Sequence, residues 1–113
     1  MPEDTVMFWT HQLVEAIGYL HSKDILHRDI KMLNVLIDEN SNLKLCDFGM
    51  SVMIPEGEQA KGMCGTPAYM APELIKHKPY RFEPDWWSLG IILYELVNKR
   101  NPFDLRNLDN IVN

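Results

Sequence analysis

The stretch "HRDIKMLN", residues 27–34, places acidic, basic and amide side chains close enough together to support chemistry. Asp29 could orient a hydroxyl group and accept its proton. Lys31 could meet a negatively charged leaving group, and Asn34 could offer a carbonyl oxygen to a hard cation. A solvated turn that is charged only because it is exposed would contain similar residue types. The surrounding sequence must therefore decide between a site that supports chemistry and a solvated turn.

A second acidic residue, Asp47, follows in the chain just before Phe48 and Gly49. Two short β-prone runs, 34–37 and 43–46, precede it and are joined by the turn-forming residues "DENSN" at 38–42, which predicts a β-hairpin. The hairpin would return Asp47 to the neighbourhood of Asn34. Together these residues would form an oxygen-rich Mg²⁺ site that water and substrate phosphates complete. A base, a cation and a metal-binding pair indicate phosphoryl transfer.

The rest of the chain predicts the elements that position these residues. Apolar residues at spacings of three and four predict an amphipathic helix over 4–22, with Asp4 or Thr5 as its N-cap. Residues 47–70 contain four glycines and two prolines, so we expect a long irregular loop of the kind that is usually functional or mobile. A short helix is expected at 71–77.

A second long helix is predicted from Pro84 to about Asn98. Its residues are apolar nearly all round, so we expect the helix to be buried in a core and Trp86 and Trp87 to pack there. Residues 104–113 are expected to begin another helix.

The composition is that of a globular protein, with 113 residues of which 46% are hydrophobic and 24% are charged. The net charge is −5 and no run of Lys or Arg exceeds two residues, which argues against nucleic acid or a membrane surface as a partner. Two cysteines without a C-x-x-C pair favour reduced thiols and an intracellular location, cytoplasmic or nuclear. No apolar stretch approaches the length of a membrane helix. The sequence does not indicate an oligomeric state.

Four motifs together resemble those of eukaryotic protein kinases. "HRDIKMLN" looks like the catalytic loop, "DFG" at 47–49 like the metal-binding motif, "APE" at 71–73 like the end of the activation segment, and "DWWSLG" at 85–90 like the D-x-W-S-x-G motif. They occur in the family's order and span essentially the whole chain, which makes the charged-turn interpretation improbable. The resemblance implies an α+β protein-kinase-like fold, here a mainly α-helical C-lobe with a short β-hairpin and an activation segment at about 47–73.

The resemblance also implies roles for the residues of the nucleotide and metal site. Asp29 would be the catalytic base, and Lys31 would stabilise charge on the transferred phosphoryl group. Asn34 and Asp47 would hold the Mg²⁺ ions that accompany ATP. Leu36 would pack against the adenine ring.

Further roles concern the surroundings of the catalytic loop. Arg28 would face the activation segment, ready to pair with a phosphate there. His27 and Phe48 would stack in an apolar spine, and Asp85 would accept hydrogen bonds from catalytic-loop N–H groups. Thr66 would hydrogen-bond toward the catalytic base and lysine. The lysine two residues after the base and the segment "GTPAYMAPE" at 65–73 imply serine/threonine specificity and a protein substrate.

The chain departs from the family's pattern in several places. None of its six glycines forms a G-x-G-x-x-G loop, and no V-A-I-K-like strand is present, so the N-lobe sheet is expected to be absent. The C-terminal helices are expected to be largely missing, which leaves Glu73 without its family-type arginine partner. Gly62 stands where relatives often carry a phosphorylated residue. Glu56 or Glu58 could substitute for that phosphate, or Ser51 could be modified.

We therefore expect residues 1–113 to be a partial protein kinase domain from a serine/threonine kinase that uses ATP and Mg²⁺ on protein substrates. The isolated 113 residues are expected to be inactive, because half of the nucleotide site is missing. A non-catalytic C-lobe interaction module is the alternative. A small-molecule phosphotransferase of kinase-like fold is a third possibility, which the segment at 65–73 disfavours.

Overall fold

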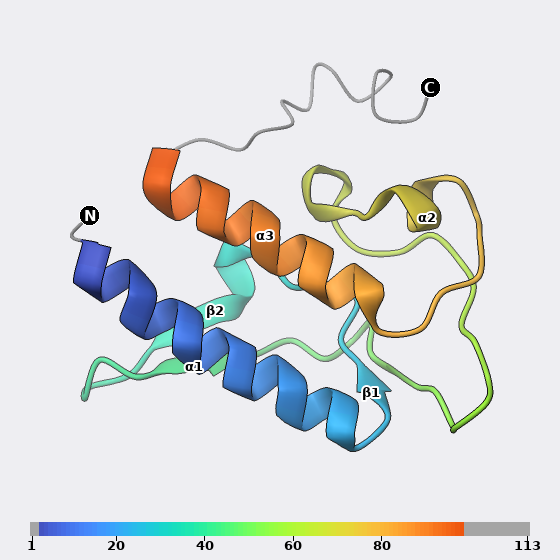
Figure 1. Ribbon diagram of the computed structural model, residues 1–113, viewed down its shortest axis with the longest axis horizontal. Coiled ribbons are helices and arrows are strands. Elements are labelled where there is room, and N and C mark those ends of the chain that lie inside the picture. The colour runs from blue at the N-terminus through green and yellow to red at the C-terminus, as the bar shows by residue number, and fades with distance from the viewer. Residues whose placement is uncertain (1–2, 99–113) are drawn as a thin grey trace.

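Two long antiparallel helices dominate the computed structural model, which describes residues 3–98 (Figure 1). These helices are α1 (Glu3–Ser22) and α3 (Glu83–Asn98). The predicted helix at 104–113 lies outside the described residues. The remaining elements are short: β1 (Ile25–Leu26), the 3-10 helix η1 (Met32–Asn34), β2 (Val35–Ile37), β3 (Leu43–Leu45), β4 (Val52–Met53), the 3-10 helix η2 (Pro67–Tyr69) and α2 (Pro72–Ile75).

The helix α1 forms because its apolar residues recur along one face, as predicted. Leu13 and Ile17 on this face join a buried cluster with α3 and with Ile30 of the loop at 27–31. Burying side chains of this size contributes roughly 1.5–3 kcal/mol each, so the cluster fixes the loop to both helices. The helix begins at Glu3, so the prediction that Asp4 or Thr5 caps it is wrong: both residues lie inside its first turn.

The helix α3 is buried in a core along one side, as predicted, but within residues 3–98 its other side is not covered, and the prediction that Trp86 and Trp87 pack in the core is wrong. Leu89, Ile92 and Leu96 face the cluster shared with α1. Trp86 and Trp87 remain 40% and 37% exposed. An apolar composition raises the chance of burial, but the elements that pack against a helix decide which of its sides is covered.

The β-hairpin is confirmed, with β2 and β3 antiparallel and Val35, Leu36 and Ile37 opposite Leu45, Lys44 and Leu43. The carboxylate of Asp38 accepts hydrogen bonds from the backbone N–H groups of Asn40 and Asn42, which stabilises the turn. Gln12 of α1 accepts a hydrogen bond from the N–H of Leu43 at 2.8 Å. The hairpin is therefore tied to α1.

A second two-stranded sheet pairs β1 with β4, and only β4 lies inside the stretch 47–70 that was predicted to be irregular. Leu26 of β1 and Ile54, which follows β4, belong to a second buried cluster with α2 and Tyr80. The helix α2 is shorter than predicted and covers Pro72–Ile75. Between residues 3 and 98, no helix is long and apolar enough to span a membrane.

Candidate functional site

The loop at 27–31, the predicted catalytic loop, leaves β1 and is held by Asp85 in the first turn of α3. The Asp85 carboxylate is 1% exposed and accepts hydrogen bonds from the backbone N–H groups of His27 at 2.9 Å and Arg28 at 3.0 Å. These are the contacts that were expected of Asp85. Arg28 has a φ of 70°, a conformation that costs a non-glycine residue roughly 1–2 kcal/mol. The two hydrogen bonds offset that cost and hold the loop in this shape.

His21 is a third donor to Asp85, with its Nε2 at 2.9 Å from Oδ2. Its ring stacks on Phe82 at a centroid distance of 4.5 Å and meets Trp86 edge-on. Sequence reasoning missed this contact of His21, which lies in the last turn of α1. Because Asp85 lies 64 residues further along the chain, no local pattern could have indicated the pair.

The imidazole of His27 connects the loop at 27–31 to the end of β3. Its Nδ1 accepts the N–H of Asp29 at 3.1 Å, and its Nε2 donates to the carbonyl oxygen of Cys46 at 3.1 Å. The backbone N–H can only donate and the carbonyl can only accept, so the proton of this ring lies on Nε2. The ring also contacts Phe48 at a centroid distance of 4.9 Å, which is the pairing the resemblance implied.

The structure brings Asp29, Lys31, Asn34 and Thr66 together in one hydrogen-bonded cluster. Asp29 Oδ1 accepts from the Thr66 hydroxyl at 3.2 Å, and the Lys31 ammonium donates to the same hydroxyl at 2.8 Å. The Lys31 ammonium lies 3.9 Å from Asp29 Oδ2. The side chains of Asp29 and Lys31 are 12% and 21% exposed, so both keep some access to solvent.

Asn34 supports Asp29 and also lies beside the end of the hairpin. Its Nδ2 donates to the Asp29 carbonyl at 2.8 Å and lies 3.4 Å from Asp29 Oδ2. Its own backbone carbonyl accepts the N–H of Cys46 at 2.9 Å, which brings Asp47 next to it. With the amide nitrogen committed to Asp29, the carbonyl oxygen of the Asn34 side chain is the end that can meet a cation.

Asp47 and Leu36 lie on an exposed part of the hairpin region. Asp47 has a φ of 58°, and its Oδ1 accepts the N–H of Gly49 at 3.3 Å. Residues 3–98 contain no group of three or more His, Cys, Asp or Glu side chains that could hold a metal ion. A carboxylate and an amide oxygen still suit Mg²⁺, which keeps several water ligands and is commonly bound by one or two carboxylates with substrate phosphates.

The predicted activation segment, 47–73, reaches the loop at 27–31 at Gly65. This glycine has a φ of 97°, and a Cβ added there would lie 2.6 Å from the Arg28 carbonyl oxygen. Only glycine allows so close an approach of the two backbones. The approach places the next residue, Thr66, within reach of Asp29 and Lys31.

The side chain of Arg28 faces the stretch 47–73, as predicted, but its partners are neutral. Its Nε donates to the carbonyl oxygen of Met50 at 2.7 Å, and its Nη1 lies 3.3 Å from the Tyr80 hydroxyl. Within the described chain, neither Glu56 nor Glu58 forms an ion pair with Arg28, so the idea that one of them substitutes for a phosphate is not supported. The sequence interpretation missed Tyr80, which no motif singles out.

Comparison with known proteins agrees with this arrangement. Residues 1–113 match the family model described as the protein kinase domain. The chain is 46% identical over 101 residues to ribosomal protein S6 kinase-related protein of Homo sapiens, an alignment that covers 89% of the chain and 25% of the relative. It is 39% identical over 116 residues to cAMP-dependent protein kinase type 3 of Saccharomyces cerevisiae, covering 99% of the chain and 29% of the relative.

A third relative is named by its specificity. The chain is 44% identical over 114 residues to cell cycle serine/threonine-protein kinase CDC5/MSD2 of Saccharomyces cerevisiae, covering 98% of the chain and 16% of the relative. The chain thus spans less than a third of the length of these curated relatives. On the family match, and with a helix-rich fold and two small sheets, the chain belongs to the eukaryotic protein kinase family.

Proposed function

We propose that this chain provides the catalytic loop and activation segment of a protein serine/threonine kinase, which transfers the γ-phosphoryl group of ATP to serine or threonine hydroxyls of protein substrates. The observation that carries the proposal is the cluster of Asp29, Lys31, Asn34 and Thr66, in which a carboxylate and an ammonium group share one hydroxyl. This is a geometry in which a hydroxyl group can be oriented and its proton accepted.

Asp29 acts as the base in this proposal. Its N–H donates to His27 and its carbonyl accepts from Asn34, so the backbone on both sides of the carboxylate is fixed. The Thr66 hydroxyl already donates to Asp29 Oδ1, which supports the ability of this oxygen to accept a proton from a substrate hydroxyl. A fixed base lowers the reorganisation needed at the moment of transfer.

Lys31 stabilises the negative charge that develops on the phosphoryl group. Its ammonium is held by Thr66 at 2.8 Å and by the more distant Asp29 carboxylate. These contacts keep the positive charge of Lys31 beside the position of the substrate hydroxyl oxygen, which attacks the phosphoryl group. In the family template, catalysis of phosphoryl transfer comes almost entirely from positioning and electrostatic stabilisation of this kind.

Asn34 and Asp47 would hold Mg²⁺, and their oxygen donors fit that ion. When bound, Mg²⁺ would neutralise part of the negative charge of the ATP phosphates. Asn34 is buried and fixed by Asp29, while Asp47 is exposed at the end of the hairpin. Leu36, which is also exposed on the hairpin, supplies an apolar surface for the adenine ring.

The test compares two Asp-to-Asn variants of a longer protein that joins these residues to the nucleotide-binding lobe of a relative. Asp29→Asn keeps the shape and the acceptor for Thr66 but removes the base, so we expect kcat for a serine peptide to fall by roughly a hundredfold or more. Asp4→Asn, an exposed residue in the first turn of α1, is the matched control and should leave kcat unchanged. Equal activity of the two variants would contradict the proposal.

The isolated 113 residues are expected to show no turnover, because they contain no Gly-rich loop to cover the phosphates. Robust phosphorylation of a peptide by these residues alone would overturn that expectation. If the joined protein binds ATP and folds but never phosphorylates a peptide, the interaction-module alternative gains support.

A further inference from the structure

Tyr80 lies buried between the catalytic loop and the middle of the activation segment. Its side chain is 3% exposed, and its hydroxyl makes two hydrogen bonds. The hydroxyl accepts from Arg28 Nη1 at 3.3 Å and donates to the carbonyl oxygen of Gly62 at 2.8 Å. One uncharged side chain thus connects the two segments, and we call this set of contacts the Arg28–Tyr80–Gly62 bridge.

The backbone around Tyr80 holds the same part of the activation segment. Tyr80 and Ala60 also form a single antiparallel β-pair. The N–H of Tyr80 donates to the Ala60 carbonyl at 3.0 Å, and the N–H of Ala60 donates to the Tyr80 carbonyl at 2.8 Å. The next residue, Arg81, donates from Nη1 to the carbonyl oxygens of Pro55 and Glu58. Residues 55–62 are therefore anchored, because Tyr80 and Arg81 donate hydrogen bonds to backbone carbonyl oxygens along this stretch.

Arg28 anchors the start of the segment with the same guanidinium group. Its Nε donates to the Met50 carbonyl oxygen at 2.7 Å while its Nη1 meets the Tyr80 hydroxyl. Within residues 3–98, no carboxylate lies within ion-pair distance of this guanidinium. Neutral oxygen atoms therefore occupy hydrogen-bonding positions of the Arg28 guanidinium that an anion could otherwise fill.

The backbone conformation at Gly62 does not suit a residue with a hydroxyl group that could be phosphorylated. Its φ is 109°, a backbone conformation that residues with a side chain rarely adopt. A serine or threonine at this position would be strained. The bridge reaches Gly62 through its backbone carbonyl, so it needs no side chain there.

We propose that Tyr80 is a positioning residue that holds the activation segment against the catalytic loop through Arg28, without a phosphate on that segment. The inference goes beyond the proposed function, and it rests on that function only for its effect on phosphoryl transfer. It assigns the ordering of residues 50–65 to hydrogen bonds that are present in the unmodified chain.

Hydrogen exchange of the unmodified and Tyr80→Phe chains tests the proposal directly. The substitution removes one oxygen atom and keeps the buried ring, so the amides of residues 59–65 should exchange roughly two- to tenfold faster, as expected for one lost hydrogen bond. The amides of α3 should keep their protection. Equal exchange at 59–65 in the two chains would overturn the proposal.

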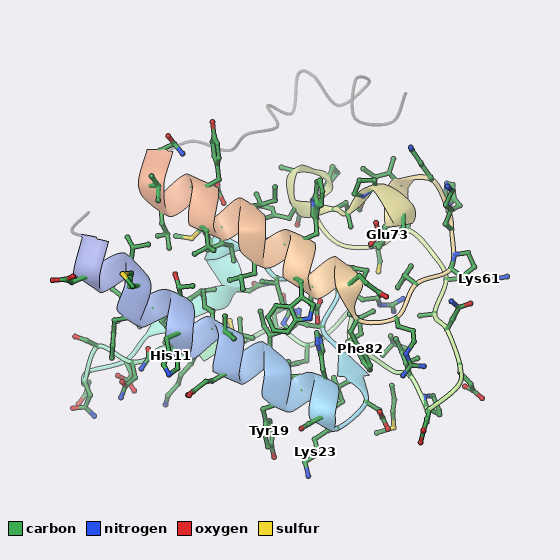
Figure 2. All side chains as sticks on the ribbon, viewed as in Figure 1. His11, Tyr19, Lys23, Lys61, Glu73 and Phe82 are labelled. Atoms are coloured by element: carbon green, nitrogen blue, oxygen red, sulfur yellow. The ribbon has the colours of Figure 1, made fainter. Side chains whose placement is uncertain are left out.

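Tyr19→Phe is the matched control. Tyr19 is 63% exposed and projects from α1 on the side away from α3, beside Lys23 (Figure 2). Lys23 lies 5.8 Å from its ring centroid, a contact that phenylalanine keeps. The variant should therefore exchange like the unmodified chain throughout 59–65.

Two further measurements decide the outcome if Tyr80→Phe loses protection everywhere. Arg28→Lys keeps the charge but removes the fork that reaches both Met50 and Tyr80, so it should speed exchange at 59–65 while α3 stays protected. The unmodified chain should also keep its protection after phosphatase treatment, with the absence of phosphate verified by mass. Loss of protection at 59–65 after that treatment would overturn the proposal.

The catalytic consequence separates this inference from the proposed function. In the joined protein, Tyr80→Phe should raise KM for the peptide severalfold and leave KM for ATP unchanged, because residues 65–73, the segment that implies a protein substrate, closely follow the residue that Tyr80 holds. If the Asp29→Asn comparison shows no phosphotransfer but the exchange results hold, the proposed function fails and the positioning role of Tyr80 stands.

Discussion

Asp29 and Asp47 both follow a short β-strand and belong to the same proposed site, but the structure holds them differently. The Asp29 carboxylate contacts Thr66, Asn34 and Lys31, and its side chain is 12% exposed. Asp47 is exposed, and its carboxylate accepts a 3.3 Å hydrogen bond from Gly49 two residues away. Asp29 is thus held by residues from separate parts of the chain, whereas the Asp47 carboxylate bonds within its own turn.

The half of the proposed site that would bind the substrate hydroxyl is thus held in place by hydrogen bonds from several elements, whereas the half that would bind the metal is less constrained. Contacts to β1, η1, η2 and α3 fix the residues that would handle the substrate hydroxyl. A metal-binding acid gains from exposure, because an ion and its phosphates must reach it. Three substitutions can break or sharpen this comparison.

The largest effect is expected for Asp85→Ala, which removes the acceptor that fixes the catalytic loop. The buried N–H groups of His27 and Arg28 would lose their partner, and so would the His21 ring. Breaking one side of a buried network of this kind costs about 3–5 kcal/mol. Urea unfolding followed by circular dichroism should therefore show a much lower midpoint. A loss below about 1 kcal/mol would mean that water replaces the carboxylate without difficulty.

An intermediate effect is expected for Gly65→Ala, with Gly57→Ala as its matched control. Both glycines have a positive φ, so both variants carry similar backbone strain. At Gly65 the added Cβ would also lie 2.6 Å from the Arg28 carbonyl oxygen, whereas at Gly57 it would meet nothing within 4 Å. We expect the free energy of unfolding to fall by roughly 1–3 kcal/mol more for Gly65→Ala, as for an overpacked site.

Equal losses for the two glycine variants would show that the backbones at 28 and 65 can separate freely. That outcome would also weaken the placement of Thr66, because Thr66 reaches Asp29 through this approach. The same unfolding measurement therefore tests how rigid the hydroxyl-handling half of the site is.

The smallest effect on stability is expected for Asp47→Ala, the exposed acid of the pair. Surface substitutions away from buried networks usually change the free energy of unfolding by less than about 0.5 kcal/mol. In the joined protein, however, the variant should need a much higher Mg²⁺ concentration for activity. A large loss of stability would show that Asp47 has a structural role and would blur the contrast with Asp29.

The elements that could be predicted from sequence are those with local causes. The helix over 4–22 and the hairpin at 34–46 follow from apolar spacing and from the turn residues around Asp38. The pairing of β1 with β4 was missed, because two strands of two residues each carry no periodic signal and meet only through tertiary contacts. Trp86 and Trp87 were assigned to the core, because an apolar helix does not reveal which of its sides will be covered.

The candidate site divides in the same way. The resemblance to protein kinases implied that Thr66 would lie beside Asp29 and Lys31, and the structure places these residues together with Asn34. The supports of that cluster, His21 and Tyr80, could not be predicted, since their partners lie on distant elements and neither belongs to a recognisable motif. The catalytic and metal roles of the cluster stay predictions that activity measurements decide.

The reach of Asp85 also bears on the order in which the chain folds. Its carboxylate binds amides that were synthesised 57 and 58 residues earlier. Closing so long a loop costs entropy that local structure does not, so α1 and the hairpin can form first. Until α3 docks, Arg28 lacks the hydrogen bond to Asp85 that holds it in its left-handed conformation. On a ribosome, the nascent chain would therefore emerge with an unshaped catalytic loop and acquire that shape only after α3 had left the exit tunnel.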